Sequence, residues 1–402
     1  MVWCSAGVRP VSGRHGAGDE SGPVLQSLVR LHLRGTPSFI PLFPGKPPMQ
    51  RRHFLYAGAG LLASTLAGCG GGSEALLRVR PDVLQLSNAE RERYVQTLHA
   101  MKRLPSAYDP AVNAYDYFVQ LHGRAFPSAQ DPTHYNAHMS ASFLPWHREF
   151  LLRFERELQR VSGDAQMALP YWDWQQQGSW RAIFTDDFLG GNGDAADRFI
   201  VKSGMFREGL WPMGAYFDET PDEFADSDGD GIADINSAPL SRRGLTRRFS
   251  FEGLDADSMQ VIDDYMAREP RSRLLAYADY DAAPYMESML TPLEHLENRQ
   301  SWIEQSMRKY LELVLHNPVH AMIGGQMATG TSPNDPVFFL HHANVDRLWA
   351  LWQDAHAGAS YPSSAEDAHV GSGASLDLLS GDVRIDSVLD LAAHSGVRYA
   401  AG

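Results

Sequence analysis

The chain has 402 residues, of which 44% are apolar and 21% charged, and its formal net charge is −14. This composition is typical of a soluble globular protein, and the length allows either two or three domains or one large domain. The negative charge argues against a nucleic-acid binder, because neutralising phosphates requires clustered lysines and arginines. Both cysteines, Cys4 and Cys69, precede residue 70, which excludes a cysteine-ligated metal or a disulfide scaffold in the rest of the chain.

Residues 49–68 predict an export signal. The segment has a basic start, an apolar run too short to span a membrane, and an exit of small residues. Its paired arginines resemble a twin-arginine export motif, and its end resembles a lipoprotein signal in which Cys69 becomes the lipid-bearing first residue. The alternative is an uncleaved N-terminus with an incidental cysteine. We expect an exported bacterial protein of the periplasm or cell envelope, anchored to the membrane only through Cys69, and we interpret residues 1–48 as a mis-annotated extension.

The remaining chain divides into a tether over residues 69–87, a domain over 88–355 and a C-terminal extension over 356–402. Within the domain, apolar residues recur at three- and four-residue intervals, the spacing that places them on one face of a helix. This periodicity predicts helices over residues 88–101, 111–122, 145–161, 291–315 and 336–353.

The helix predicted over residues 145–161 carries charges at four-residue spacing. Glu149 with Arg153, and Arg153 with Glu157, form pairs of opposite sign that share one helical face. Because large apolar residues define the other face, we expect both ion pairs on the exposed side of the helix.

An acidic, loop-rich insertion is predicted over residues 186–287, with 22 acidic and 10 basic side chains. Within it, alternating carboxylates around glycines resemble a calcium-binding loop, because a hard cation prefers oxygen ligands. The twelfth position of that loop is Ser237 where a glutamate would be expected, so a solvated acidic turn remains the alternative. The candidate calcium ligands are Asp226, Asp228, Asp230 and Asp234.

Six of the sixteen histidines form two groups of three. The i, i+4 spacing of His316 and His320 places two imidazoles on one helical face, where they could share a metal. A site made of imidazoles suits copper, zinc, iron or nickel and does not suit calcium or magnesium. For isolated histidines a structural role is the expectation, and this applies to His99, His295, His356 and His394. The two groups are His122, His138 and His147, and His316, His320 and His342.

Two segments around these histidines resemble the copper signatures of the tyrosinase family, whose members hold a binuclear copper site. They are HMSASFLPWHREFLL from residue 138 and HNPVHAMIGGQMATGTSPNDPVFFLHHANVDRLWAL from residue 316. Between them, LPYWDW and DFLGGNG also match the bacterial branch, and the resemblance covers about residues 88–355. It implies a mainly α fold with a four-helix bundle core around two copper ions and long loop-rich insertions.

The resemblance also assigns the ligands. The first copper would be held by His122, His138 and His147, and the second by His316, His320 and His342. His341 would then be a neighbour of the second site and not a seventh ligand. No cysteine lies near His138, so the cysteine–histidine bridge of the fungal and plant branches is not expected.

Family members use dioxygen to hydroxylate monophenols at the ortho position and to oxidise o-diphenols to o-quinones, so a phenol and dioxygen are the expected partners. By resemblance, Asn317 and Glu312 would hold a water that accepts the phenol's proton, and Phe338 would pack over the coppers and the substrate ring. A helix-surface carboxylate and plain core packing are the alternatives for Glu312 and Phe338. Asp335 and Asp346 could accept imidazole N–H groups or hold the fold.

Several other functions are compatible with a histidine-rich site. The nearest is a catechol or o-aminophenol oxidase that lacks the hydroxylation step. A dioxygen-binding protein like haemocyanin, or a lipid-tethered copper-storage protein, would bind the metals without forming quinones. A di-iron carboxylate enzyme is excluded, because it needs two Glu-x-x-His pairs and the sequence offers only Glu366 with His369 in a Gly/Ser-rich segment.

Overall fold

The computed structural model describes residues 77–125, 137–213, 243–249, 271–287, 302–376, 378–379 and 382–401. Two compact units divide the chain, and all described residues belong to the unit that contains residues 74–402. The predicted export signal, Cys69, His295 and the candidate calcium ligands Asp226, Asp228, Asp230 and Asp234 lie outside the described residues.

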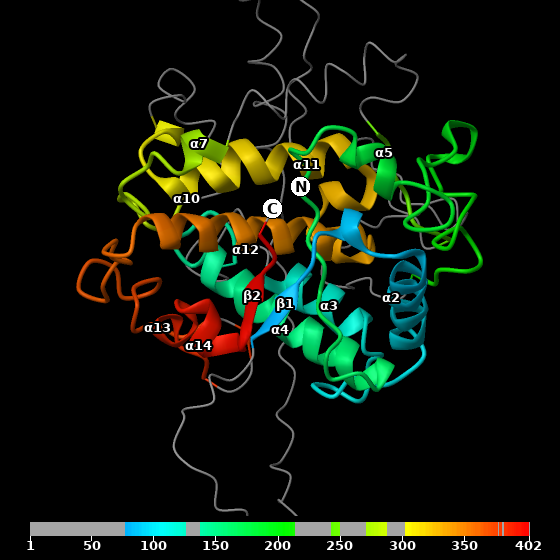
Figure 1. Cartoon of the computed structure of the whole chain (residues 1–402), viewed down its shortest axis with the longest axis horizontal. Coiled ribbons are helices and arrows are strands. Elements are labelled where there is room, and N and C mark those ends of the chain that lie inside the picture. The colour runs from blue at the N-terminus through cyan, green and yellow to red at the C-terminus, as the bar shows by residue number, and fades with distance from the viewer. Residues whose placement is uncertain are drawn as a thin grey trace, which may run out of the picture. The chain divides into compact units, whose positions relative to one another are not determined.

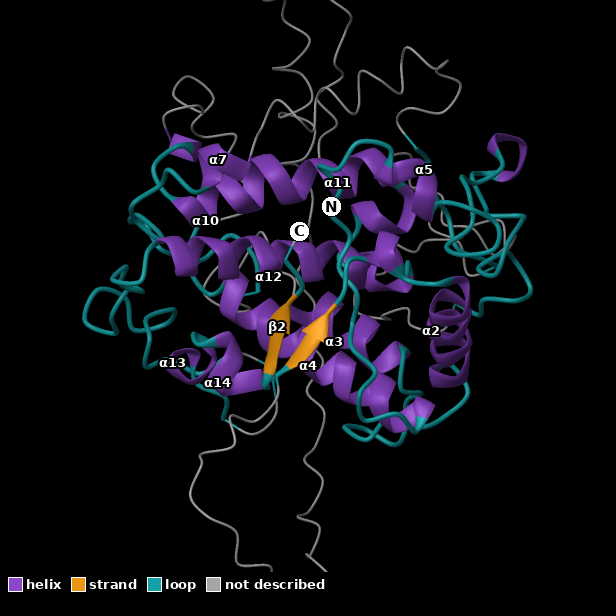
Figure 2. Ribbon diagram, viewed as in Figure 1, coloured by secondary structure: helices purple, strands orange, loops and turns teal. Residues whose placement is uncertain are grey.

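Helices dominate the described part of the chain, which confirms the predicted mainly α fold (Figure 2). Among these residues, none of the helices combines the length and apolarity needed to cross a bilayer. The helices are α2 (Asn88–Met101), α3 (Asp116–Ala125), α4 (Phe143–Ser162), α5 (Ser179–Ile183), α7 (Arg271–Leu274), α10 (Met307–Tyr310), α11 (Asn317–Ile323), α12 (Val337–Ala355), α13 (Ile385–Val388) and α14 (Leu391–Ser395). Short helical turns are η2 (Val83–Gln85), η3 (Ala195–Asp197), η5 (Leu311–His316), η6 (Gly325–Ala328) and η7 (Ser332–Asn334), and the strands are β1 (Arg78–Arg80) and β2 (Val397–Tyr399).

Local signals explain where the long helices begin and end. Helix α2 has the predicted bounds because Ser87 and Glu90 form a capping box at its start. Helix α3 begins later than predicted, because the side chain of Asn113 accepts the N–H groups of Tyr115 and Asp116 and so forms a turn before the helix. Helix α4 ends at Gly163, whose φ of +70° lies in the left-handed region that favours glycine.

Aromatic side chains fill the space between α3, α4 and α12. The rings of Phe154 on α4 and Phe339 on α12 stack with centroids 3.4 Å apart, and Phe118 on α3 meets Phe154 edge-on at 5.2 Å. Such pairs add to the stabilisation gained from burying the rings. Figure 1 shows α12 running beside the α10–α11 segment, with α3 and α4 on its other side. These four segments form the predicted four-helix core.

A π-helical turn interrupts the segment that was predicted as one helix over residues 291–315. In this turn, η5, the N–H of Asn317 donates to the carbonyl of Glu312, five residues earlier. Pro318 follows at once, and a proline ring would clash with the carbonyl four residues before it in a regular α-helix. The wider π turn relieves that clash, and such turns are frequent at functional sites.

The charged face of α4 is buried, so the prediction that its ion pairs are exposed to solvent is wrong. Glu149, Arg153 and Glu157 are at most 4% exposed. Arg153 donates to Glu149 as predicted, but Glu157 pairs with Arg160 and accepts the N–H of Ala107. The loop after α2 covers this face, which periodicity within α4 alone could not reveal.

The N-terminal and C-terminal ends of the described unit lie side by side. Strand β1 pairs in parallel with β2, with Arg78 opposite Val397, and the two strands lie side by side in Figure 1. The side chain of Arg80 is fully buried and donates to Glu155, Asp346 and Tyr399. The predicted tether over residues 69–87 therefore extends too far, because its last part contributes a strand and a buried ion pair to the fold.

The described parts of the acidic insertion contain the short helical elements η3 and α7 and isolated β-bridges, one of which joins Ile200 to Thr246. Its residues 243–249 pack against the segment before α12, where both Nε and a terminal nitrogen of Arg247 donate to Asp335 at 2.7 Å. Gly325 approaches this segment so closely that a Cβ atom would lie 2.2 Å from the carbonyl oxygen of Thr246. The insertion is thus attached to the core beside the second histidine group.

Candidate metal centre

Four core segments bring the predicted histidine groups together. All six side chains are at most 4% exposed, and within each group the candidate ligand atoms lie within 4.8 Å of one another. The second group also contains the neighbouring His341. The first group consists of His122 on α3, His138 in the turn before α4 and His147 on α4, and the second consists of His316 at the end of η5, His320 on α11 and His342 on α12.

Backbone carbonyls fix the orientation of the first group. Nδ1 of His122 lies 2.7 Å from the carbonyl of Gly330, and Nδ1 of His147 lies 2.8 Å from that of Phe143. Because a carbonyl only accepts, Nδ1 carries the proton in both rings, and Nε2 presents a bare lone pair. Nε2 of His122 faces Nε2 of His138 at 3.0 Å.

The second group repeats this arrangement. Nδ1 of His320 donates to the carbonyl of Met327 at 2.6 Å, and Nδ1 of His316 donates to Oδ1 of Asn317 at 2.7 Å. The Nε2 atoms of His316, His320 and His342 form a triangle with sides of 3.0, 3.2 and 3.2 Å. The lone pairs of His316 and His320 repel each other at this distance unless a cation lies between them, so the geometry fits a metal.

The protonation state of the rings supports the same interpretation. Burial lowers the pKa of His122 to about 3 and that of His320 to about 4, and it lowers the pKa of the other four well below the ordinary value. Neutral imidazole is the form that binds metal, and an all-imidazole set suits copper. Nε2 of His147 has no hydrogen-bond partner among the described residues, so it also remains available as a ligand atom.

His341 and His342 differ in orientation although both are fully buried. Nε2 of His342 points toward Nε2 of His316 and His320, whereas the ring of His341 stacks on that of His316 with centroids 5.0 Å apart and an angle of 15°. Neither ring nitrogen of His341 has a hydrogen-bond partner within the described part of the chain. The geometry favours His342 as the third ligand and His341 as a packing neighbour.

Two phenylalanines touch both histidine groups. Phe338 stacks on His342 at 4.0 Å and meets His122 edge-on at 4.9 Å. Phe143, which the sequence analysis did not single out, meets His147 at 4.9 Å and His316 at 5.0 Å. Phe143 precedes His147 by four residues, just as Phe338 precedes His342, and this matching interval was the signal that could have identified it. Both rings are fully buried and exclude water from the centre.

The structure places Glu312 and Asn317 next to different histidine groups. Glu312 is fully buried, which excludes the helix-surface alternative; its Oε1 accepts the N–H of Met139 at 2.7 Å and lies 4.0 Å from Nδ1 of His138. Burial raises the pKa of Glu312 to about 7 although Arg308 and Met139 oppose the shift. Oδ1 of Asn317 accepts from His316. The water that Glu312 and Asn317 would share stays a prediction.

Asp335 and Asp346 hold the fold. Asp335 accepts two hydrogen bonds from Arg247, and Asp346 accepts from Arg148 at 2.6 Å. The imidazole N–H groups described above instead donate to backbone carbonyls and to Asn317. Of the two roles expected for these carboxylates, the structure therefore supports the one of holding the fold, since both are bonded to arginines.

The histidines expected to be structural have ordinary partners. Nε2 of His99 lies 3.0 Å from the carbonyl of Met205, and Nδ1 of His356 donates to the carbonyl of Trp352. Nε2 of His394 lies 2.7 Å from Oε2 of Glu149. None of these three belongs to either metal group.

The sequence of the chain is similar to known proteins over most of its length. The family model described as the common central domain of tyrosinase matches residues 112–355. A tyrosinase of Streptomyces antibioticus is 36% identical over 71% of this chain and 86% of its own length, and a grixazone synthase of Streptomyces griseus subsp. griseus is 31% identical over 70% and 86%. The solved tyrosinase from Burkholderia thailandensis superposes with a TM-score of 0.49 and 17% identity, covering 81% of this chain and 74% of that one. Both histidine groups lie within the matched residues 112–355, and the chain belongs to the tyrosinase family and is a copper-dependent phenol oxidase.

Proposed function

We propose that this enzyme uses dioxygen both to hydroxylate monophenols at the ortho position and to oxidise o-diphenols to o-quinones. The observation that carries the proposal is the direct contact between the two histidine groups: the rings of His147 and His342 stack with centroids 4.4 Å apart. The two groups therefore adjoin, and the metals that they would hold would lie close to each other. The two coppers, held by the six histidines, would supply dioxygen binding and electron transfer.

Side chains around the two histidine groups provide an apolar, ordered environment for a phenol. Phe338 and Phe143 present apolar rings to the histidines, and the carbonyls of Gly330 and Met327 hold the imidazoles in place. Hydroxylation also requires that the phenol lose a proton whose free pKa is about 10. Glu312 lies beside His138 in the first group, and Asn317 lies beside His316 in the second. These two polar side chains support a proton acceptor next to the histidines.

A second candidate function is catechol or o-aminophenol oxidation without hydroxylation. One observation favours it: Oε1 and Oε2 of Glu312 already accept from Met139 and Arg308, and Oδ1 of Asn317 already accepts from His316. These bonds compete with a water for the same oxygens. The relative named grixazone synthase is also nearly as similar to this chain as the tyrosinases are.

Oxygen consumption separates these functions. The copper-loaded protein is given a monophenol and, in a parallel assay, its matching catechol. We expect oxygen uptake and quinone formation with both substrates. Uptake with the catechol alone would establish the second candidate, and no uptake by protein that holds two coppers would indicate storage or dioxygen binding.

Replacing Asn317 tests the proposed proton acceptor. We expect Asn317→Ala to lower kcat for the monophenol by roughly 10- to 100-fold more than kcat for the catechol, the range typical of groups that support metal ligands. Asn317→Asp, which keeps an oxygen for Nδ1 of His316, is the control for ligand orientation. Equal losses on both substrates at unchanged copper content would remove Asn317 from the hydroxylation step.

The segment over residues 49–69 supports export and lipid attachment at Cys69, which we infer as the route to the cell envelope. Cys69→Ala is expected to move the protein from the membrane fraction to the soluble fraction of bacterial cells. Replacing both arginines of the signal by lysine should retain the protein in the cytoplasm. Unchanged fractionation of Cys69→Ala would reject the lipid anchor.

A further inference from the structure

His138 differs from the other predicted ligands because it lies in a turn and not in a helix. The turn precedes α4, and its next residue, Met139, has a φ of +53°. A non-glycine residue adopts this left-handed region only at a cost in free energy, so the surrounding structure must hold it there. The position of His138 therefore depends on contacts made by its neighbours in the chain.

Hydrogen bonds from two other segments hold this turn. The N–H of Met139 donates to Oε1 of Glu312 at 2.7 Å, and the carbonyl of Met139 accepts the N–H of Glu287 at 2.9 Å. The N–H of Ala141 donates to the carbonyl of Tyr285 at 2.7 Å. The carboxylate of Glu312 is the side chain bonded directly to the N–H of Met139, the residue next to His138, so its placement helps to fix the turn there.

Arg308 connects the partners of the turn. Its Nε and one terminal nitrogen donate to the two oxygens of Asp281 at 2.9 and 3.1 Å. Its other terminal nitrogen donates to Glu312 at 3.1 Å and to Glu287 at 3.3 Å. Lys309 pairs with the second oxygen of Glu287 at 3.0 Å. Arg308, Lys309 and Glu312 are fully buried, so the charges at the inner end of the cluster are balanced by one another.

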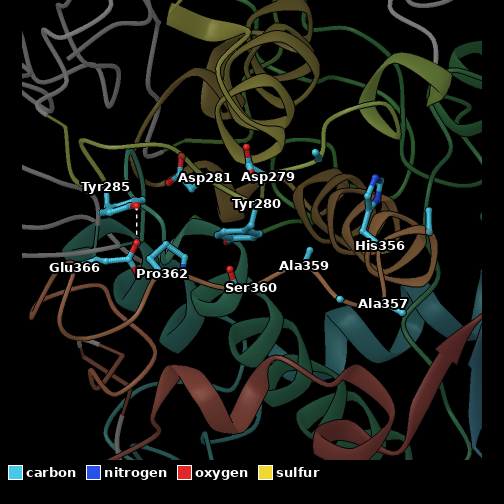
Figure 3. A pocket seen from close by; sticks show the side chains of 13 residues that line it. Asp279, Tyr280, Asp281, Tyr285, His356, Ala357, Ala359, Ser360, Pro362 and Glu366 are labelled. Carbon is cyan, nitrogen blue, oxygen red and sulfur yellow. Dashed lines mark hydrogen bonds between the residues drawn. The ribbon is translucent and has the colours of Figure 1, made fainter.

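The outer end of this cluster reaches a surface pocket. Figure 3 shows Asp281, Tyr280 and Tyr285 on the wall of that pocket, with the hydroxyl of Tyr285 bonded to Glu366. The hydroxyl of Tyr280 donates to the carbonyl of Ala141, in the same turn as His138. The cluster thus extends from the pocket wall to the first histidine group.

We propose that Arg308 is a positioning residue for the first copper, acting through Glu312 and Glu287 on the turn that carries His138. Its planar fork holds Asp281 while its third nitrogen holds the other two carboxylates, a geometry that lysine cannot reproduce. Loss of the fork lets the carboxylates repel one another, and Glu312 then no longer fixes the N–H of Met139. The ligands of the second group lie on η5, α11 and α12 and are not carried by this turn. The proposal concerns copper retention and does not depend on whether the enzyme hydroxylates monophenols.

Copper release from the folded holoenzyme tests the proposal. The protein is loaded with copper and mixed with excess chelator, and the release of each copper is followed over time. We expect Arg308→Lys to accelerate release of one copper about 10- to 100-fold, as is typical when a group that orients a ligand is lost, and to leave the other at the wild-type rate. In a His320→Ala background, which retains the first group, the remaining copper should show the acceleration. In a His122→Ala background, which retains the second group, it should not.

Arg80→Lys is the matched control, because Arg80 is equally buried and also bonds two carboxylates, Glu155 and Asp346. It should lower the melting temperature without selective copper release. Should Arg308→Lys fail to fold, Asp281→Asn, at the far end of the cluster, is measured in the same way, with a smaller effect on the first copper expected. Wild-type release from both sites, or equal acceleration of both coppers, would overturn the proposal.

Discussion

At the scale of single residues, the centre depends on which imidazole nitrogen carries the proton. Four of the ligand histidines donate Nδ1–H to a protein oxygen, which leaves Nε2 as the metal-binding atom. Because the donor and the ligand are opposite edges of one ring, each hydrogen bond also sets the direction of the lone pair. Of the two adjacent histidines of α12, His342 directs Nε2 toward the other ligands, whereas His341 stacks on His316.

His342 and His341 are expected to respond differently to replacement. His342→Ala removes an Nε2 that faces two other ligands, so we expect loss of one copper and of catechol oxidation. His341→Ala removes a packed ring and should lower stability by about 1–3 kcal/mol while both coppers stay bound. Copper content per chain, measured by elemental analysis, checks both variants. Loss of a copper from His341→Ala would make it a ligand.

Single residues were predictable from the sequence where a motif fixed them. The signatures of the family identified all six histidines that the structure brings together. They did not identify Arg308, because its partner Asp281 is 27 residues away in the chain and the contact arises only on folding. The acceptors of the imidazole N–H groups were missed for a related reason: a backbone carbonyl leaves no trace in the sequence.

At the scale of elements, the start of α3 is held by a buried ion pair. Nζ of Lys102, just after α2, lies 2.5 Å from Oδ1 of Asp116, the first residue of α3, and both side chains are at most 6% exposed. Asp116 also stabilises the helix through its position at the positive end of the helix dipole. This pair fixes the helix that carries His122.

Breaking the pair should be costly. We expect Lys102→Met to lower the free energy of unfolding by about 3–5 kcal/mol, because it leaves a buried carboxylate without its cation and with only the amide of Asn113 bonded to its side chain. The double variant Lys102→Met with Asp116→Asn should recover part of that loss. Arg384→Met, which breaks an exposed pair with Asp386, is the control and should leave stability essentially unchanged. A loss in Lys102→Met no larger than in this control would contradict the assignment.

Helical periodicity predicted the elements better than their surroundings. It closely predicted the bounds of α2 and α12. It wrongly assigned Glu149 and Arg153 to a solvent-exposed face, because charged residues usually mark the exposed side of a helix. In this protein other segments cover that face, and His394 reaches it from the C-terminal part of the chain. Contacts between segments distant in sequence, including the β1–β2 pair, do not follow from periodicity.

At the scale of the whole molecule, buried tyrosines should make the protein sensitive to alkaline pH. Burial raises the pKa of Tyr115, Tyr280 and Tyr399 well above the ordinary value of 10.0. Above pH 10 the unfolded chain loses these protons while the folded chain keeps them, so stability falls as the pH rises further. Denaturant unfolding of the metal-free protein between pH 8 and 11 measures the slope, which should be smaller in Tyr399→Phe. A slope unchanged by that substitution would contradict the prediction.

Copper should stabilise the whole fold. A ligand that binds only the folded state raises its stability in proportion to the logarithm of ligand concentration over Kd. Since the histidines come from α3, the turn before α4, α4, η5, α11 and α12, the metals would connect segments from both halves of the chain. We expect removal of copper to lower the melting temperature and readdition to restore it. No difference between the two forms would mean that the metals do not join these segments.

The central claim is that both histidine groups hold copper and that phenol oxidation requires the pair. Titrating copper into the metal-free protein, while measuring oxygen uptake with a catechol at each step, tests it most directly. We expect little activity at low occupancy and maximal activity only at two coppers per chain. Maximal activity at one copper per chain, or no activity at two, would contradict it.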